Sequence, residues 1–304
     1  MKNVNRRDFA RKCLAVAATG FVFSKAHAAK SAPLAFSTLG CPAWDWKTII
    51  EQAKKMGYSG LELRGIKKQM DLPTLPEFAG TAWKQSLKEV EDSGLKIINL
   101  GASTQLHEPR SSRRKADLDS AKKFIDLAHN LKCPYIRVFG DRFVKDEPRQ
   151  ATVDRVIAGL KELGEHAKGS GVTVLLESHG DFNKSSDLKP IFENVGMSEV
   201  GLLWDMHHTY VFGNEPPAET WKQMRKYVRH LHIKDSRREG SDVRYMLIGT
   251  GTVPVKETIS ILRSGGYKGW YSLEWEKGWH PELEEPEVAF PYFVKMMREY
   301  LGES

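Results

Sequence analysis

Four residues of metal-binding type follow short apolar runs in the second half of the sequence: Glu177, Asp205, His232 and Glu274. Aspartate and glutamate are seldom buried unless they are paired or bind a metal. Three carboxylates and one imidazole favour a divalent cation over a zinc site built from thiolates. Such a cation could hold neighbouring hydroxyl and carbonyl oxygens of a substrate and ease removal of a proton from the adjacent carbon. The sequence therefore predicts one bound divalent ion, Mn²⁺ in preference to Mg²⁺, Co²⁺ or Zn²⁺.

The elements that must position these residues alternate between strands and helices. Near-continuous apolar runs of the strand type are typical of parallel strands that are covered on both faces. Eight of them occur, at 34–39, 60–64, 96–100, 135–139, 172–177, 200–205, 230–234 and 270–275. Amphipathic helical segments lie between or after them, at 46–56, 81–93, 114–131, 151–168, 217–228, 255–263 and 287–300. Several of these end in a glycine suited to a helix C-terminus, as at 56–58, 93–95 and 265–267.

Eight strand-and-helix units in roughly 270 residues predict an α/β fold, a (β/α)8 TIM barrel that forms a single domain over 33–304. A doubly wound open sheet is the alternative. However, its phosphate-binding glycine pattern is missing from the first strand-to-helix turn, at 39–43.

The barrel explains why the four metal-binding residues would meet. Active-site residues of such barrels project from the C-terminal ends of the strands. Glu177, Asp205, His232 and Glu274 lie at or near the ends of the fifth to eighth expected strands. Each could instead be a rim salt bridge or a satisfied core histidine, but four such coincidences at one rim favour a shared site.

The basic excess of the chain is concentrated at its start. The 304 residues include 46 Lys and Arg against 39 Asp and Glu, a formal net charge of +7. Residues 1–28 contain six Lys or Arg and one Asp, so they account for +5 and leave +2 for the remainder. A twin arginine within 5–9, an apolar stretch at 13–23 and Ala-His-Ala at 26–28 predict a twin-arginine-type signal peptide. We therefore expect the export machinery as a partner, cleavage near Ala29 and a periplasmic protein; an amphipathic first helix is the alternative.

Composition also excludes several classes of partner. A charge of +2 after residue 28 removes the main support for a nucleic-acid partner. No apolar run approaches the ~18 residues of a membrane-spanning helix, so we expect no stable insertion of the mature chain. Three cysteines cannot form a disulfide framework, and we expect Cys41 and Cys133 to be free thiols. Homo-oligomer formation is left open.

Five short motifs resemble the xylose-isomerase-like TIM barrel superfamily, the sugar phosphate isomerase/epimerase group that includes ketose 3-epimerases, inosose dehydratase and endonuclease IV. They are Gly-Tyr-Ser-Gly-Leu-Glu-Leu at 57–63, Leu-Glu-Ser-His-Gly at 176–180, Trp-Asp-Met-His-His at 204–208, His-Leu-His-Ile-Lys-Asp at 230–235 and Leu-Glu-Trp at 273–275. The resemblance implies that Glu177, Asp205, His232 and Glu274 hold the metal. Our hypothesis is that Glu177 and Glu274 also act as the acid/base pair on opposite faces of the substrate carbon.

Further residues carry over from the epimerases in this group. A histidine three residues after the metal-binding aspartate and an arginine six after the metal-binding histidine imply that His208 and Arg238 bind the substrate. The second catalytic glutamate of those enzymes is replaced here by Asn183, which cannot serve as a base. His179 lies two residues after Glu177 and could act as an acid or base near neutral pH instead.

Other polar and aromatic residues lie on or just after strand ends. Lys234 lies two residues after His232, so strand alternation puts both side chains on one side, where a cation could stabilise an enolate. Substrate contacts are predicted for Glu62, His107 and Trp275, and Arg64, Trp44, Trp279 and His280 are further pocket candidates. The aromatic residues among them suit the apolar faces of sugar rings but could equally pack in the barrel.

These residues predict a metal-dependent enzyme that isomerises or epimerises a sugar or keto-sugar by abstracting a proton next to its carbonyl. The replacement at Asn183 keeps a lyase or hydratase acting on a 3-keto-glycoside or an inosose as the close alternative. An endonuclease IV-like nuclease and a non-catalytic sugar-binding barrel are remote alternatives. Export would disfavour a phosphorylated substrate.

Overall fold

The computed structural model describes residues 31–303. The expected signal peptide, with its predicted cleavage near Ala29, therefore lies outside the described residues. Residues from Ala32 onward form one compact unit. No helix in the described part of the chain is long and apolar enough to cross a lipid bilayer.

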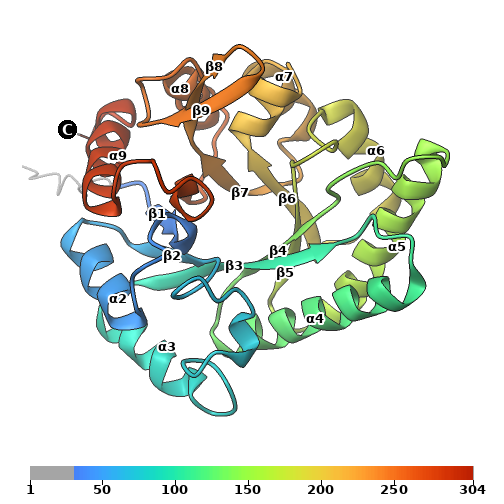
Figure 1. Cartoon of the computed structure of the whole chain (residues 1–304), viewed down its shortest axis with the longest axis horizontal. Coiled ribbons are helices and arrows are strands. Elements are labelled where there is room, and N and C mark those ends of the chain that lie inside the picture. Colours follow the sequence, from blue (N-terminus) through green and yellow to red (C-terminus); the bar gives the residue numbers. More distant parts are fainter. Residues whose placement is uncertain (1–30, 304) are drawn as a thin grey trace, which may run out of the picture. The chain divides into compact units, whose positions relative to one another are not determined.

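Eight parallel strands close into a barrel in the order β1-β10-β7-β6-β5-β4-β3-β2, which confirms the predicted fold. Figure 1 shows the helices on the outside of these strands. The barrel strands are β1 (Leu34–Ser37), β2 (Gly60–Leu63), β3 (Lys96–Gln105), β4 (Tyr135–Phe139), β5 (Thr173–Glu177), β6 (Val200–Asp205), β7 (Val228–Ile233) and β10 (Tyr271–Leu273). All eight predicted strands are present, with ends that differ by a few residues.

The helices around the barrel are α2 (Trp46–Lys55), α3 (Trp83–Asp92), α4 (Ser111–Asn130), α5 (Arg149–Ala167), α6 (Ser185–Val195), α7 (Pro217–Met224), α8 (Val255–Ser264) and α9 (Pro286–Tyr300). Helix α6 was not predicted. Its interior Pro190 obscures the helical signal, because proline removes an interior hydrogen bond. Its buried Leu188, Ile191, Phe192 and Val195 nevertheless follow the spacing of one helical face.

Local sequence signals explain where several helices begin and end. The carboxylate of Asp45 accepts a hydrogen bond from the backbone N–H of Thr48 and so caps α2. Gly57, Gly94 and Gly266 have φ values of +84°, +75° and +78°, which glycine adopts without steric cost. The predicted glycine ends of these three helices are therefore confirmed.

An antiparallel hairpin that the sequence did not predict follows β7. It consists of β8 (Asp235–Glu239) and β9 (Asp242–Met246), and it precedes α8. The buried carboxylate of Asp235 accepts hydrogen bonds from the backbone N–H groups of Gly249, Gly251 and Val253. A Cβ atom at Gly251 would lie 2.2 Å from Oδ1 of Asp235, so glycine is needed for the chain to pass so close. The hairpin is thereby anchored beside the carboxyl end of β7.

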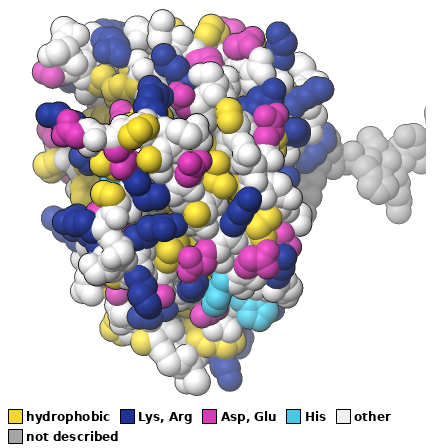
Figure 2. Space-filling view, turned by 90° about the vertical axis from the view of Figure 1, so that its right-hand side faces the viewer, with side chains coloured by type: hydrophobic (Ala, Val, Ile, Leu, Met, Phe, Trp, Pro, Cys, Tyr) yellow, Lys and Arg dark blue, Asp and Glu magenta, His cyan; other side chains and the backbone are white. Residues whose placement is uncertain are grey.

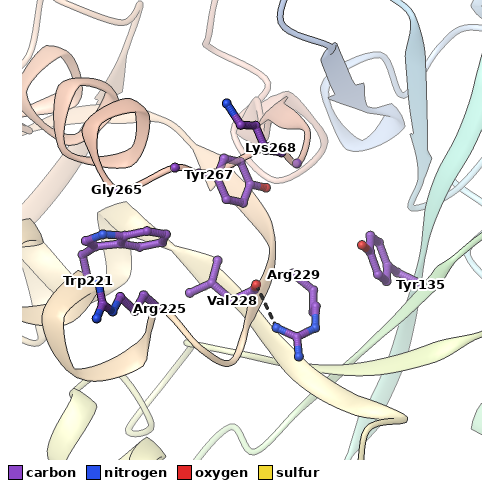
Figure 3. A pocket seen from close by; sticks show the side chains of 10 residues that line it. Tyr135, Trp221, Arg225, Val228, Arg229, Gly265, Tyr267 and Lys268 are labelled. Atoms are coloured by element: carbon purple, nitrogen blue, oxygen red, sulfur yellow. Dashed lines mark hydrogen bonds between the residues drawn. The ribbon is translucent and has the colours of Figure 1, made fainter.

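The outer surface carries charges of both signs. On the face shown in Figure 2, Lys and Arg side chains are interspersed with Asp and Glu side chains. A cavity of about 450 Å³ lies near the starts of β4 and β7, lined by Tyr135, Trp221, Val228 and Arg229 among others (Figure 3). This is the amino-terminal end of the barrel strands, where (β/α)8 enzymes do not place their chemistry.

Candidate metal centre and active site

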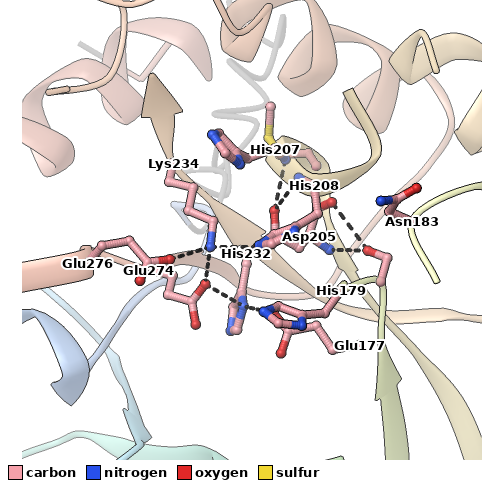
Figure 4. Close-up of polar contacts among 12 residues, drawn as sticks. Glu177, His179, Asn183, Asp205, His207, His208, His232, Lys234, Glu274 and Glu276 are labelled. Carbon is pink, nitrogen blue, oxygen red and sulfur yellow. Dashed lines mark hydrogen bonds and ion pairs between the residues drawn. The ribbon is translucent and has the colours of Figure 1, made fainter. Parts of the chain in front are cut away.

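The four predicted metal ligands meet at the carboxyl ends of neighbouring strands. Glu177 ends β5, Asp205 ends β6, His232 lies in β7 and Glu274 directly follows β10. One ligand atom from each lies within 4.8 Å of those of the other three, and all four side chains are buried. Nδ1 of His232 is 3.0 Å from Oε1 of Glu177 and 3.1 Å from Oε2 of Glu274 (Figure 4).

Glu62 orients the histidine of this cluster from the opposite side of the ring. Its two carboxylate oxygens lie 2.8 Å from Nε2 of His232 and 2.8 Å from Nε2 of His230. Because an ionised carboxylate only accepts hydrogen bonds, Nε2 of His232 carries a proton and Nδ1 faces the cluster. Glu62 was predicted to contact the substrate, but the structure places it behind His232, with no exposed surface.

Asp205 divides its two oxygens between the backbone and the cluster. Oδ1 accepts hydrogen bonds from the backbone N–H groups of His207 at 2.9 Å and His208 at 3.0 Å. Oδ2 lies 2.8 Å from Nζ of Lys234. Burial raises the pKa of Asp205 to about 6, because the nearby ammonium group offsets only part of the desolvation.

Lys234 is enclosed by carboxylates, as Figure 4 shows. Its ammonium group contacts Asp205, Glu274 and Glu276, and only 2% of the residue's surface is exposed. Burial lowers the pKa of Lys234, but the three carboxylates outweigh it and hold that pKa well above its usual value. Glu276 was missed in the sequence, although its position two residues after Glu274 was a usable signal. Lys234 thus shares two carboxylates, Asp205 and Glu274, with the candidate metal centre.

A buried arginine that was also missed lies beside Glu177. Nε of Arg137 is 3.1 Å from Oε2 of Glu177, and its guanidinium carbon is 3.9 Å from the centre of the Phe139 ring. The signal for Arg137 was a charged residue in the middle of an apolar strand. At Gly101 a Cβ atom would lie 2.8 Å from Cδ of Arg64 and 2.9 Å from Nη2 of Arg137. Glycine therefore gives two guanidinium groups room near the metal centre.

His179 lies beside the cluster with an acidic neighbour. Nδ1 of His179 is 3.5 Å from Oδ1 of Asp141, and its ring is centred 4.6 Å from that of His208. The side chain of His179 is 34% exposed, so it can reach a bound molecule. The glycine in the Glu-x-His-Gly motif has a structural reason, because a Cβ atom at Gly180 would lie 2.0 Å from the carbonyl oxygen of Asp141. Asp141, two residues after β4, was missed in the sequence.

Other predicted site residues lie outside the cluster. Arg238 is exposed on the hairpin, where its guanidinium donates to the carbonyl oxygen of Val211. Trp275 lies in the hydrophobic core, and its indole N–H donates to the carbonyl oxygen of Glu284. His107 is buried in the segment after β3, and its Nδ1 atom has no hydrogen-bond partner within residues 31–303.

His207 and Asn183 form hydrogen bonds outside the cluster. Nε2 of His207 lies 2.8 Å from Oγ of Ser236, so this histidine connects to the hairpin while His208 faces His179. The side-chain amide of Asn183 donates to the carbonyl oxygen of Gly180, and Figure 4 shows Asn183 apart from the cluster.

The residues of the cluster fit a divalent cation. Burial lowers the pKa of His232, but Glu274, Glu62 and Glu177 together hold it well above its usual value. A second ring proton, on Nδ1, therefore lies among carboxylates at the position where a cation would bind, and metal binding would displace it. Three carboxylates and one imidazole suit Mn²⁺, Mg²⁺ or Co²⁺ and also allow Zn²⁺.

Comparisons with known proteins place the chain in a family. The family described as xylose isomerase-like TIM barrel matches residues 50–299. An inosose isomerase from Halalkalibacterium halodurans is 26% identical over 237 residues, which cover 74% of this chain and 80% of that protein. An inosose dehydratase from Bacillus thuringiensis is 26% identical over 167 residues, 49% of this chain and about half (54%) of that enzyme. A crystal structure of the IOLI protein with a bound zinc atom aligns with a TM-score of 0.73 and 19% identity, covering 89% of this chain and 98% of that one.

Proposed function

Because the chain belongs to the xylose isomerase-like TIM barrel family, we propose that it is a divalent-metal-dependent enzyme of sugar-like substrates. The reaction is isomerisation or epimerisation by proton abstraction next to a carbonyl. The observation that carries this proposal is that carboxylate oxygens of Glu177 and Glu274 lie 3.0 Å and 3.1 Å from Nδ1 of His232. A periplasmic location, reached through the segment 1–28, is part of the proposal.

The metal would be held by Glu177, Asp205, His232 and Glu274, with Glu62 orienting His232. Such an ion would supply positive charge to the substrate oxygens and so would acidify the carbon next to the carbonyl. Mn²⁺ is the preferred ion for this mainly oxygen-based ligand set.

Glu177 and Glu274 act as the acid/base pair. Burial raises the pKa of Glu177, but Arg137 and His232 outweigh it and lower that pKa below its usual value. For Glu274, His232 and Lys234 likewise overcome the effect of burial. Both carboxylates are therefore ionised near neutral pH and can accept a proton. One takes the proton from one face of the substrate carbon, and the other, which has first accepted a proton from water, returns that proton to the opposite face. The first then releases its proton to water, so that both carboxylates are ionised again.

Two cations support the negative charge that develops on the substrate oxygen. Lys234 and Arg137 are both nearly fully buried, which makes their electrostatic effect stronger than in water. Nη1 of Arg137 is buried without a hydrogen-bond partner among the described residues, so one of its N–H groups remains unsatisfied near Glu177.

A dehydratase or lyase acting on an inosose or a 3-keto-glycoside is the second candidate. An elimination needs one base and one acid, and His179 beside Asp141 provides the acid. Burial lowers the pKa of His179, but Asp141 and Glu177 outweigh it, so that the imidazole can hold a proton near neutral pH. His179 would protonate the departing oxygen while Glu177 or Glu274 removes the carbon-bound proton. The name of one curated relative, inosose dehydratase, is consistent with this chemistry.

One NMR experiment tests both candidates. Purified protein loaded with Mn²⁺ is incubated in D₂O with unphosphorylated ketoses, 3-keto-glycosides and an inosose. Deuterium at the carbon next to the carbonyl, together with an epimer or isomer, supports the first candidate, whereas an unsaturated product supports the second. Glu177→Gln and Glu274→Gln should each abolish turnover in a folded protein. The matched control is Glu284→Gln, an exposed carboxylate in the segment after β10. Exchange that persists in either active-site variant removes that glutamate from the mechanism.

A further inference from the structure

A second cavity adjoins the metal centre above the ends of β1, β2 and β10. Its walls include Leu39, Pro42, Arg64, Lys68, Met70 and Trp279. Strand β1 pairs with both β2 and β10, and Glu274 directly follows β10, so the cavity and the metal centre share one rim. Arg64 connects them, because it lines the cavity and packs against Gly101 together with Arg137, whose Nε lies 3.1 Å from Glu177.

One wall of this cavity is an exposed indole. Trp279 is 54% exposed, although large aromatic side chains are usually buried for most of their surface. Its backbone is held in place, since its N–H donates to the carbonyl oxygen of Glu276 at 2.9 Å. A Cβ atom at the preceding Gly278 would lie 2.6 Å from Cδ1 of Leu39, so this segment packs tightly on the segment after β1. The exposed indole offers a flat surface on which the apolar face of a ring can stack.

The polar side of the cavity is cationic. Arg64 and Lys68 line it, and none of the lining residues is acidic. Nη1 of Arg64 donates to the carbonyl oxygen of Gly101 at 3.3 Å, and within the described part of the chain its guanidinium makes no other hydrogen bond. Burial and the neighbouring Arg137 lower the pKa of Arg64 to about 10, so it stays charged near neutral pH.

Lys68 is kept at an unfavourable backbone position. Lys67 and Lys68 have φ values of +48° and +65°, and they form the tight turn that joins Ile66 to Gln69. A two-residue turn with two positive φ angles strongly prefers Asn-Gly, because other residues are strained there. Strained residues cluster at functional sites. Lys68 lines the cavity, whereas Lys67 is not among its walls.

We infer that this cavity binds the second ring of a glycoside whose first ring lies at the metal centre. The second ring stacks on Trp279 and presents a carboxylate to Lys68 and Arg64. This inference rests on the proposed function, since it extends the same site, and it names the substrate class as an acidic glycoside. A carboxylate matches the paired cations, and a ring with an apolar face matches the indole.

The first test compares single-ring and two-ring substrates. The probes are 3-keto-glucose, 3-keto-cellobiose and the same disaccharide with a carboxylate on its second ring. Trp279→Ala should lower kcat/KM for both disaccharides by about tenfold, the size of one stacking contact, and leave 3-keto-glucose unchanged. Trp83→Ala, which removes a partly buried indole from the outer helix α3, is the matched control and should change none of them. An equal loss on the single-ring substrate would overturn the inference.

The second test uses the strained turn. Lys68→Gly and Lys67→Gly should both raise the thermal midpoint, because each relieves a positive φ. Only Lys68→Gly should weaken use of the carboxylate-bearing disaccharide, by about tenfold, relative to the neutral one. Equal behaviour of the two variants toward that disaccharide would refute the role of Lys68.

Failure of the inference can be told apart from failure of the proposed function. If the wild type converts none of the three probes, the proposed reaction does not extend to 3-keto-glycosides. Tryptophan fluorescence can then measure binding of the disaccharides, which tests the cavity independently of the reaction. Quenching that disappears in Trp279→Ala supports the second-ring site, and quenching that is absent or unchanged in that variant overturns it.

Discussion

Replacing Lys234 by methionine should make the stability of this protein depend strongly on a bound divalent metal. The ammonium group of Lys234 is buried and contacts Asp205, Glu274 and Glu276. Methionine fills a similar volume but carries no charge, so three buried carboxylates lose their counter-charge.

The size of the stability loss depends on which of the three carboxylates a bound metal ion can neutralise in place of Lys234. Removing one partner of a buried ion pair costs about 3–5 kcal/mol of unfolding free energy, and this is the loss expected in the metal-free protein. A divalent ion restores positive charge to Asp205 and Glu274, which leaves only Glu276 without a partner. Burial already raises the pKa of Glu276, so it can be protonated, and the loss should fall to about 1–2 kcal/mol. By the thermodynamic cycle, the difference of roughly 2 kcal/mol means that Lys234→Met binds the metal about 30-fold more tightly.

Urea unfolding with a chelator and with saturating Mn²⁺ measures the two losses, and titration calorimetry measures Mn²⁺ affinity directly. Lys277→Met is the matched control. The Lys277 ammonium is also buried but bonds to the carbonyl oxygens of Pro281 and Leu283 and to the carboxylate of Glu285. The Lys277→Met variant should lose the same amount of unfolding free energy with and without metal. The reasoning is refuted if Lys234→Met loses equal stability in both conditions or binds Mn²⁺ more weakly than the wild type.

Three further predictions use other features of the chain. Glu62→Gln should weaken metal binding 10- to 100-fold without unfolding the barrel, because His232 loses the carboxylate that orients it; unchanged affinity in calorimetry would argue against that role. Burial raises the pKa of the Cys41 and Cys133 thiols, so neither should react with an alkylating agent at pH 8 until urea unfolds the protein, as mass spectrometry of labelled peptides would show. Mass spectrometry of the protein recovered from a periplasmic fraction should find an N-terminus near Ala29, and an uncut cytoplasmic chain would contradict the export proposal.

The sequence was most informative where a strand ends in a polar residue. Apolar runs of strand length recurred often enough to predict the closed barrel, and this fold puts all strand ends at one rim. Glu177, Asp205 and His232 could therefore be grouped before any contact was known. Where local signals compete, the prediction failed. Proline inside α6 hid a helix, and β8 consists largely of charged residues that lack a strand's apolar pattern.

Only the tertiary structure decided which buried groups face one another inside the barrel. Glu62 and His232 are 170 residues apart in the sequence, and their 2.8 Å contact joins strands that are not neighbours in the sheet. Strand alternation predicts that a side chain points inward, but closure and register decide what it meets there. For the same reason the salt bridge of Arg137 to Glu177 and the enclosure of Lys234 by three carboxylates appear only once all eight strands are in place. The residue types of the metal centre are thus determined locally, whereas their charge states and orientation are determined by packing across the barrel.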